Sequence, residues 1–229
     1  MLSSLPPFVL FFVGAVVIAF TRGTVRKVLI LAIPLVGGLN LLFGVEPGLH
    51  LQFDLLGYTL TPYRADKLSL LFGYLFHLAA FLGFVYALHL GDGAPEGSVA
   101  GEVGEDDIVG NASAGLQHVA AMVYAGSALG AVFAGDFITL FIFWELLAIS
   151  SAFLVWARKS ERSYATGFRY LIIHVISGVL LLSGALMLAH ETGSIEFGHV
   201  GLAGTGAAGW ILLLSFGIKA GFPLLHNWI

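Results

Sequence analysis

The chain has 229 residues, of which 58% are hydrophobic and 10% charged, and its mean hydropathy is +0.94. Soluble domains carry about 25% charged residues, so this composition predicts an integral membrane protein. Cysteine is absent, which excludes disulfides, thiolate-bound zinc and iron–sulfur ligation by this chain. The net charge of −4 is not accompanied by a basic patch, which argues against a nucleic-acid partner.

About seven apolar runs approach the length of roughly 20 residues that a helix needs to cross a bilayer. Unbroken runs of this kind do not show the alternating strands of a membrane β-barrel. The sequence therefore predicts an all-α membrane protein that forms a single transmembrane domain over residues 1–229. Its helices are expected at about residues 5–21, 28–43, 68–90, 116–134, 137–157, 164–190 and 207–225.

Two connections between these helices have a recognisable character. The stretch before the third helix alternates apolar and polar residues around Gly57, which predicts a short hairpin at the outer surface. Residues 91–115 are rich in Gly, Asp and Glu and contain no Lys or Arg, so they are expected to form a polar, acidic loop.

Basic residues predict the orientation of the chain in the membrane. They cluster after the first and fifth expected helices, and cytoplasmic connections carry an excess of Lys and Arg. We therefore expect a multi-pass protein of the inner (plasma) membrane with its N-terminus outside and its C-terminus in the cytoplasm. The two clusters are Arg22, Arg26 and Lys27, and Arg158, Lys159 and Arg162.

Two charged residues lie near the middle of otherwise apolar runs, Glu145 in the fifth expected helix and Lys219 in the seventh. An ionisable side chain at the bilayer centre costs about 2.5 to 3.5 kcal/mol on insertion scales. Each should therefore face protein or water and find a partner, and we expect Glu145 and Lys219 to be partners of each other. A structural ion pair that only fixes the two helices is the alternative.

Three strings in the fifth, sixth and seventh expected helices are GDFITLFIFWELLAISSAFLV, YLIIHVISG and SFGIKAGFPLLHNWI, and the third expected helix begins with ADKLSLLF. Together they resemble the antiporter-like, proton-pumping subunits that respiratory complex I shares with Mrp-type cation/proton antiporters. The resemblance implies that the WEL glutamate, Glu145, modulates the proton affinity of a buried lysine, Lys219, which carries the proton. It also implies that protons and monovalent cations such as Na⁺ are the transported ions.

Members of this family have about twice as many helices as this chain, arranged in two inverted repeats. The resemblance therefore implies partners, namely other membrane subunits and a chain or segment that supplies the second half, besides lipid. Cation/proton exchange in an Mrp-type complex is the expected function. A subunit of a complex I-like or hydrogenase-like redox complex is the near alternative, and a non-transporting scaffold is the alternative of another class.

Further polar residues are weaker candidates for the same path. His174 in the sixth expected helix is a candidate relay, because histidine titrates near neutral pH, whereas His77 and His118 are expected to be structural. His226 and Asp136 are weak candidates, and Asp136 is expected mainly to cap the fifth helix. We expect no cofactor and no metal site, and no enzyme-like set of nucleophile, base and metal is apparent.

Ser150 and Ser151 follow Glu145 on the same expected helix. Their hydroxyls could line the proposed path, or they could bond back to carbonyl groups of their own helix.

Overall fold

The computed structural model describes residues 5–90, 105–157, 160–197 and 206–223. Within these ranges the chain forms seven helices and a two-stranded hairpin between the second and third helices, which confirms the predicted fold class. The elements are α1 (Pro7–Phe20), α2 (Gly23–Gly44), β1 (Gly48–Leu55), β2 (Tyr58–Ala65), α3 (Lys67–Leu90), α4 (Glu105–Phe133), α5 (Phe137–Trp156), α6 (Glu161–Thr192) and α7 (Gly206–Ala220).

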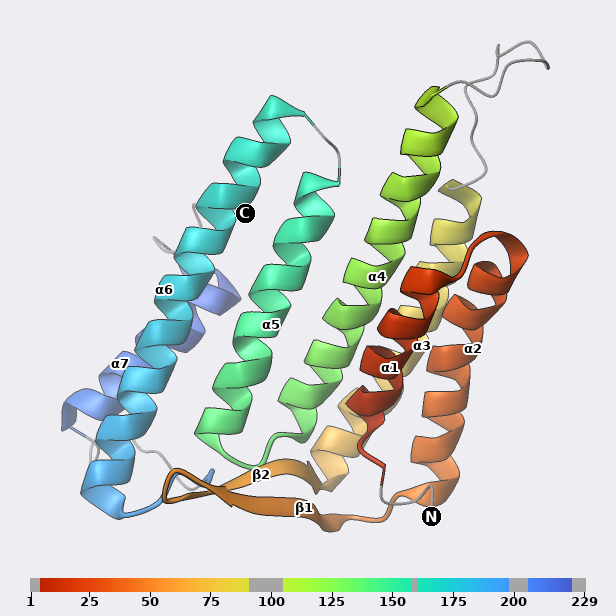
Figure 1. Ribbon diagram of the computed structural model, residues 1–229. Helices are drawn as coiled ribbons and strands as arrows, with labels where there is room; N and C mark the ends of the chain where they lie inside the picture. The colour runs from red at the N-terminus through yellow and green to blue at the C-terminus, as the bar shows by residue number, and fades with distance from the viewer. Residues whose placement is uncertain (1–4, 91–104, 158–159, 198–205, 224–229) are drawn as a thin grey trace.

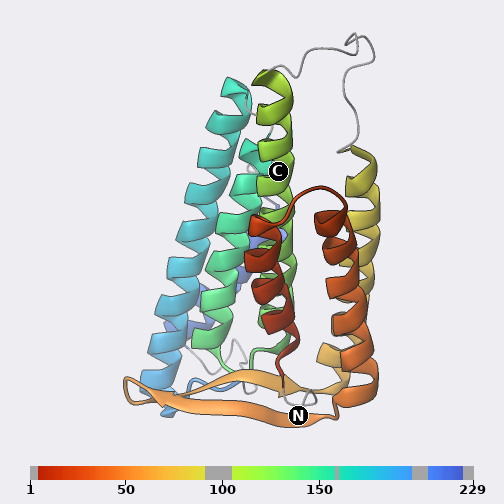
Figure 2. The same cartoon turned by 45° about the vertical axis from the view of Figure 1, so that its right-hand side comes forward.

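Helices α1 to α6 stand side by side, and the hairpin lies across one end of them (Figure 1; Figure 2). The turn from α1 to α2, the end of α5 and the start of α6 lie at the opposite end (Figure 1). Helix α7 packs along α6, and α4 packs against both α1 and α5. Five helices among the described residues are long and apolar enough to cross a membrane, while α1 and α7, with 14 and 15 residues, are apolar but shorter.

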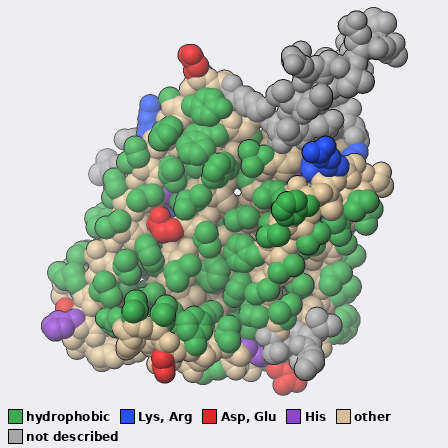
Figure 3. Space-filling model, viewed as in Figure 1, with side chains coloured by type: hydrophobic (Ala, Val, Ile, Leu, Met, Phe, Trp, Pro, Cys, Tyr) green, Lys and Arg blue, Asp and Glu red, His purple; other side chains and the backbone are tan. Residues whose placement is uncertain are grey.

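Hydrophobic side chains cover most of the face of the helix bundle that Figure 3 shows. Phe20 is 86% exposed and Phe43 is 82% exposed, and many valines and leucines on the same helices are more than half exposed. An apolar surface of this extent would drive aggregation in water, whereas lipid chains solvate it. The protein is a multi-pass membrane protein.

The hairpin is antiparallel and turns at Leu56 and Gly57, as the alternation around Gly57 predicted. Both residues have positive φ, 53° and 84°, which is typical of the two-residue turn that matches strand twist. Strand β2 lies on the helix bundle and buries Leu60, Thr61 and Tyr63. The hairpin is thus a cap over one end of the bundle.

Among the described residues, two larger hydrophobic cores divide the helices into two groups, and a third, small cluster lies beside the hairpin. One fills the space among α1, α2, α3 and α4 around Phe11 and Phe133, and the other joins α5, α6 and α7 around Leu181 and Leu212. Gly184 lets α6 approach α7 closely, because a Cβ at this position would meet the Leu212 side chain at 2.8 Å. This second core brings together the helices that carry Glu145 and Lys219.

Helices α2 and α4 begin well before the residues that the sequence predicted, and α6 begins slightly before, at Glu161. Helix α2 begins at Gly23, so Arg26 and Lys27 lie in its first turns rather than in a connection. Helix α4 begins at Glu105, so the predicted polar loop over residues 91–115 is wrong for its second part, while residues 91–104 lie outside the described residues. Charged residues do not end a helix where it leaves the bilayer, so an apolar run understates the length of such a helix.

Helix α7 ends at Ala220, before the predicted limit of residue 225. Gly221 adopts a left-handed conformation with φ 67°, and the Phe222 N–H donates to the Gly217 carbonyl at 2.9 Å. A left-handed glycine followed by this hydrogen bond is a common helix stop. Lys219 therefore lies in the last turn of α7, beside carbonyl groups that the helix leaves without intrahelical partners.

Candidate functional site

Helix α5 begins at a fully buried aspartate. The Asp136 carboxylate accepts hydrogen bonds from the Thr139 N–H at 2.7 Å, the Thr139 hydroxyl at 2.6 Å and the Thr61 N–H of β2 at 2.6 Å. The predicted N-cap is confirmed, and the same side chain ties the hairpin to α5. Both carboxylate oxygens have protein donors, so Asp136 is held as a structural anchor, and its suggested part in ion movement stays a prediction.

Lys219 reaches from α7 to the middle of α5. Its Nζ donates a hydrogen bond to the Trp144 carbonyl at 3.1 Å and lies 4.8 Å from the centre of the Trp144 ring. Carbonyl oxygens and aromatic faces both attract a cation, and both act more strongly where water is excluded. The Lys219 ammonium is therefore held by a single residue in two ways.

Glu145 follows Trp144 on α5 and faces α6. A Cβ on Gly178 would overlap the Glu145 Oε1 atom, so the carboxylate rests against the bare backbone of that glycine. Oε1 is buried and has no hydrogen-bond partner within the described part of the chain.

Glu145 and Lys219 lie near enough to interact electrostatically. Within the residues that the structure describes, however, they form no ion pair shorter than 4.0 Å, and the lysine hydrogen bond goes to the Trp144 carbonyl instead. The expected direct pair is therefore separated in this structure, with the two charges held by different neighbours.

His174 completes a group of three ionisable side chains from three helices. It is 1% exposed in α6 and also lies within electrostatic reach of Lys219. Its ring lies 4.1 Å from the ring of Tyr170, whose hydroxyl is 2.8 Å from the Ser151 Oγ of α5. Polar groups thus continue from Lys219 through His174 and Tyr170 to Ser151.

The two serines of α5 were expected either to line the proposed path or to bond back to their own helix, and they differ in this respect. Ser150 donates back to the Leu146 carbonyl at 2.6 Å, and Ser151 donates back to the Leu147 carbonyl at 2.7 Å. Ser151 alone of the two also contacts the α6 polar residues, through its Tyr170 partner. Only Ser151 therefore extends the group around Lys219.

The sequence did not identify three residues as part of the site, namely Trp144, Ser177 and Ser215. The Trp144 indole N–H donates to the Ser177 Oγ at 3.2 Å, and Ser177 and Ser215 each donate to the backbone carbonyl of the other at 3.0 and 2.7 Å. Both serines are fully buried between α6 and α7. A serine in an apolar run is a weak signal, because its hydroxyl usually bonds to its own helix.

The remaining candidate histidines lie elsewhere. His77 packs in the first core, with its Nδ1 2.7 Å from the Gly73 carbonyl and its ring 5.3 Å from that of Phe11. His118 in α4 lies near the basic residues Arg26 and Lys27. Neither joins the group around Lys219, and His226 lies outside the described residues.

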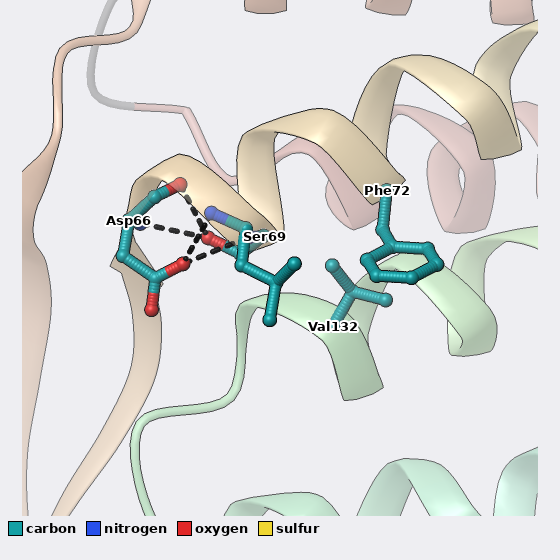
Figure 4. Close-up of a pocket in the computed structure, with 5 residues that line it drawn as sticks. Asp66, Ser69, Phe72 and Val132 are labelled. Carbon is teal, nitrogen blue, oxygen red and sulfur yellow. Dashed lines mark hydrogen bonds between the residues drawn. The ribbon is translucent and has the colours of Figure 1, made fainter.

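A shallow hollow of about 200 Å³ lies at the start of α3, against Val132 of α4 (Figure 4). Asp66 and Ser69 cap α3 reciprocally: the Ser69 N–H donates to the Asp66 carboxylate at 2.8 Å, and the Asp66 N–H donates to the Ser69 Oγ at 2.7 Å. The Ser69 N–H is the main group that holds the pKa of the Asp66 carboxyl below its ordinary value. Within the described ranges, no three or more His, Asp or Glu side chains form a cluster suited to a metal ion.

The fold and the site together define a class: a membrane-embedded helical protein in which a glutamate, a lysine and a histidine from three helices lie close together. Residues 134–229 match the family model described as "NADH:quinone oxidoreductase/Mrp antiporter, TM". Over these residues the chain is similar to antiporter-like membrane proteins named as parts of hydrogenase-4 and of Na(+)/H(+) antiporters.

Individual relatives match less than half of the chain. Hydrogenase-4 component B of Escherichia coli is 36% identical over 98 residues, which are 41% of this chain and 14% of that protein. A Na(+)/H(+) antiporter protein of Bacillus subtilis is 29% identical over 110 residues, 44% of this chain and 22% of that protein.

Solved structures share the whole fold. The chain superposes over its full length on 46% of a chain of respiratory complex I from Thermus thermophilus, with a TM-score of 0.69 and 19% identity. It also superposes on 47% of a chain of the archaeal membrane-bound sulfane sulfur reductase, with a TM-score of 0.72 and 18% identity. The chain spans less than half the length of these proteins, all of which are named as parts of larger assemblies.

Proposed function

We propose that this chain forms a proton-translocating half of an antiporter-like subunit, with Lys219 as the proton carrier and Glu145 as the group that modulates it. The observation that carries the proposal is the position of the Lys219 ammonium. It is held on the Trp144 carbonyl, inside an apolar helix bundle and within electrostatic reach of both Glu145 and His174.

The physical basis is the competition between desolvation and a neighbouring charge. Burial disfavours the charged form of a lysine, whereas a carboxylate within about 4 to 6 Å favours it. A change of three pKa units corresponds to about 4 kcal/mol, which the approach or withdrawal of one carboxylate could supply at low polarity. Movement of Glu145 relative to Lys219 would therefore load and release a proton.

His174, Tyr170 and Ser151 are the proposed continuation of this path across α6 and α5. The ring of His174 lies against that of Tyr170, and the Tyr170 hydroxyl and the Ser151 Oγ are within hydrogen-bond distance. A histidine can accept a proton on one ring nitrogen and release one from the other. Water molecules would have to complete the path from Lys219 to either surface.

The energy source that we favour is exchange of protons for a monovalent cation, as in an Mrp-type complex. The relatives that are named as Na(+)/H(+) antiporter proteins support this choice. The alternative is a redox-driven complex, which is supported by hydrogenase-4 component B and by the two solved respiratory complexes. In both cases we expect further membrane subunits and a location in the plasma membrane.

Replacement of Lys219 by Ala tests the proposal in sealed inverted membrane vesicles that contain the assembled complex. We expect normal amounts of complex and a loss of proton movement of about tenfold or more, since an essential carrier would be missing. Transport by the Lys219→Ala variant at the wild-type rate would support the scaffold alternative and contradict the proposal. Acidification driven by an imposed Na⁺ gradient would indicate exchange, whereas acidification that requires an electron donor would indicate the redox alternative.

A further inference from the structure

Trp144 contacts Lys219 through its backbone carbonyl and its ring, and its indole N–H is bound by α6. Its backbone carbonyl accepts the lysine hydrogen bond at 3.1 Å, and its ring centre lies 4.8 Å from the ammonium. Its indole N–H donates to the Ser177 Oγ of α6 at 3.2 Å, and the ring of Phe216 packs edge-on against it at 5.3 Å. The orientation of the indole that Lys219 contacts is therefore determined by α6 and α7.

Ser177 and Ser215 join those two helices to each other. Each hydroxyl donates to the backbone carbonyl of the other serine, at 3.0 and 2.7 Å, and both side chains are 0% exposed. Ser215 precedes Lys219 by about one helical turn on α7, and Ser177 follows His174 by about one turn on α6. The exchange of hydrogen bonds thus fixes the register of α6 and α7 beside the three ionisable side chains.

We propose that Trp144, Ser177 and Ser215 are positioning residues that hold the Lys219 ammonium on the Trp144 carbonyl and away from the Glu145 carboxylate. This inference rests on the proposed function, because it concerns the lysine that the proposal makes the proton carrier. Trp144 and Glu145 are adjacent on α5, so their oxygens compete for one ammonium group. The balance between the two positions depends on how firmly the indole is held.

The competing arrangement follows from the surroundings of Glu145. Its Oε1 rests against Gly178, one residue beyond Ser177, and has no hydrogen-bond donor within the described part of the chain. An ammonium that left the Trp144 carbonyl would find an acceptor there. Weakening the Trp144 anchor should therefore change the proton concentration at which transport is half-maximal, and not only the amount of folded protein.

Two variants remove the anchor while they preserve most of the packing. Ser177→Ala deletes the acceptor of the indole hydrogen bond and, with it, the donor to the Ser215 carbonyl. Trp144→Phe keeps an aromatic face and the backbone carbonyl and deletes only the indole N–H. Ser183→Ala is the matched control, because Ser183 lies on the same helix, is exposed and donates back to the Val179 carbonyl of its own helix. Ser177→Thr restores the hydroxyl and serves as the rescue.

The experiment measures the rate of proton movement against external pH in vesicles that contain the full complex, together with the amount of assembled complex. We expect Ser177→Ala and Trp144→Phe each to change the half-maximal proton concentration by at least about three- to tenfold, the effect of the one indole hydrogen bond that both variants lose. Ser183→Ala should match the wild type, and Ser177→Thr should return toward it.

The inference is overturned if the two variants only lower the amount of complex and leave the half-maximal proton concentration unchanged. Lys219→Ala is measured in the same series to separate this result from failure of the proposed function. If Lys219→Ala transports normally, the proton-carrier role itself is wrong. If Lys219→Ala is inactive and Ser177→Ala is indistinguishable from wild type, only the positioning role is wrong.

Discussion

At the scale of single residues, Gly178 determines where the carboxylate of Glu145 can lie. The Glu145 carboxylate packs against α6 at Gly178, and it occupies the space that a Cβ would take at that position. The two positions in which the Lys219 ammonium could rest, on the Trp144 carbonyl or beside Glu145, therefore differ in their neighbours. In the first position the ammonium contacts the Trp144 carbonyl and the Trp144 ring. In the second it would contact the Glu145 carboxylate, which itself rests against Gly178.

Gly178→Ala should displace the Glu145 carboxylate without unfolding the protein. The overlap involves the far end of a flexible side chain, which can rotate away, so the assembled amount should stay near that of the wild type. We expect proton movement to fall about ten- to hundredfold, because small misplacements of a reacting group have effects of this size. Transport assays in vesicles with parallel quantification of the complex measure both quantities.

Gly83→Ala is the control for this prediction. Gly83 lies in α3, and a Cβ added there meets no atom within 4 Å, so the exchange should leave both transport and assembly unchanged. If Gly178→Ala also transported like the wild type, the position of the Glu145 carboxylate would not matter for the rate. That result would contradict the role given to Glu145.

At the scale of elements, helix ends are closed by short-range hydrogen bonds that fix where the polar residues lie. Asp136 caps α5, Asp66 caps α3, and the left-handed Gly221 stops α7 directly after the turn that holds Lys219. The start of α5 lies beside β2, the start of α3 lies beside the hollow, and the end of α7 carries Lys219. The ends therefore position functional and interfacial groups as well as ending the helices.

The cap at α3 gives a pH-dependent prediction. The Asp66 pKa is lower in the folded protein than in the unfolded chain, chiefly because the Ser69 N–H donates to the carboxylate. The stabilisation from the charged group is therefore complete above the unfolded pKa of about 3.9 and is lost as the pH falls through the folded value. Asp66→Ala should lower the free energy of unfolding at pH 7 by about 0.5 to 2 kcal/mol, the usual range for a cap.

Thermal unfolding in detergent, followed by helical circular dichroism, measures this difference. The gap between the wild type and Asp66→Ala should be constant near neutral pH and shrink at pH values below about 4. Asp66→Asn should keep most of the stability, because asparagine also caps helices well. A gap that stayed the same in acid would show that the charge of Asp66 makes no contribution.

The elements were largely predictable because their pattern is local. Unbroken apolar runs predicted seven helices, and alternation around Gly57 predicted the hairpin. The limits of α2, α4 and α7 were not predictable from the same criterion. Charged turns at Arg26 and Glu105 are helical outside the apolar runs, and Gly221 ends α7 inside one.

The site was predictable only where a residue was rare in its surroundings. Glu145, His174 and Lys219 stand out in apolar helices because ionisable groups are costly there, and the structure brings them together. Ser177 and Ser215 did not stand out, since their roles follow from the packing of α6 on α7. The hydrogen bond from Lys219 to a backbone carbonyl also has no signature in the sequence.

At the scale of the whole molecule, one end of the bundle is assembled from distant parts of the chain. The Gly135 N–H donates to the Thr61 carbonyl at 2.8 Å, and the Phe137 N–H donates to the Ile195 carbonyl at 3.1 Å. The hairpin, the turn before α5 and the segment after α6 thus form one layer. The first turns of α2 and α6, with Arg26 and Arg162, lie at the other end (Figure 1).

This division predicts which end faces the cytoplasm. Basic residues favour the cytoplasmic side, so the hairpin layer should face outward. The sequence contains no cysteine, which makes single-cysteine labelling direct. Leu56→Cys, at a turn residue that is 91% exposed, should react with a membrane-impermeant maleimide in intact right-side-out vesicles.

Glu161→Cys, at the exposed start of α6, is the companion variant and should react only after the vesicles are opened. The opposite pattern of labelling would show that the orientation is reversed. Reaction of both variants in intact vesicles would show that the two ends are not separated by the membrane.

The indole hydrogen bond from Trp144 to Ser177 also predicts how these two positions vary together among related proteins. Loss of the Ser177 hydroxyl alone would leave a buried N–H without an acceptor, which is costly, whereas loss of both partners together is nearly neutral. Natural substitutions at the two positions should therefore be correlated: lineages that replace the tryptophan by phenylalanine can accept alanine at the serine position, and lineages that retain the tryptophan cannot. The residues at these two positions would therefore be expected to change together rather than independently.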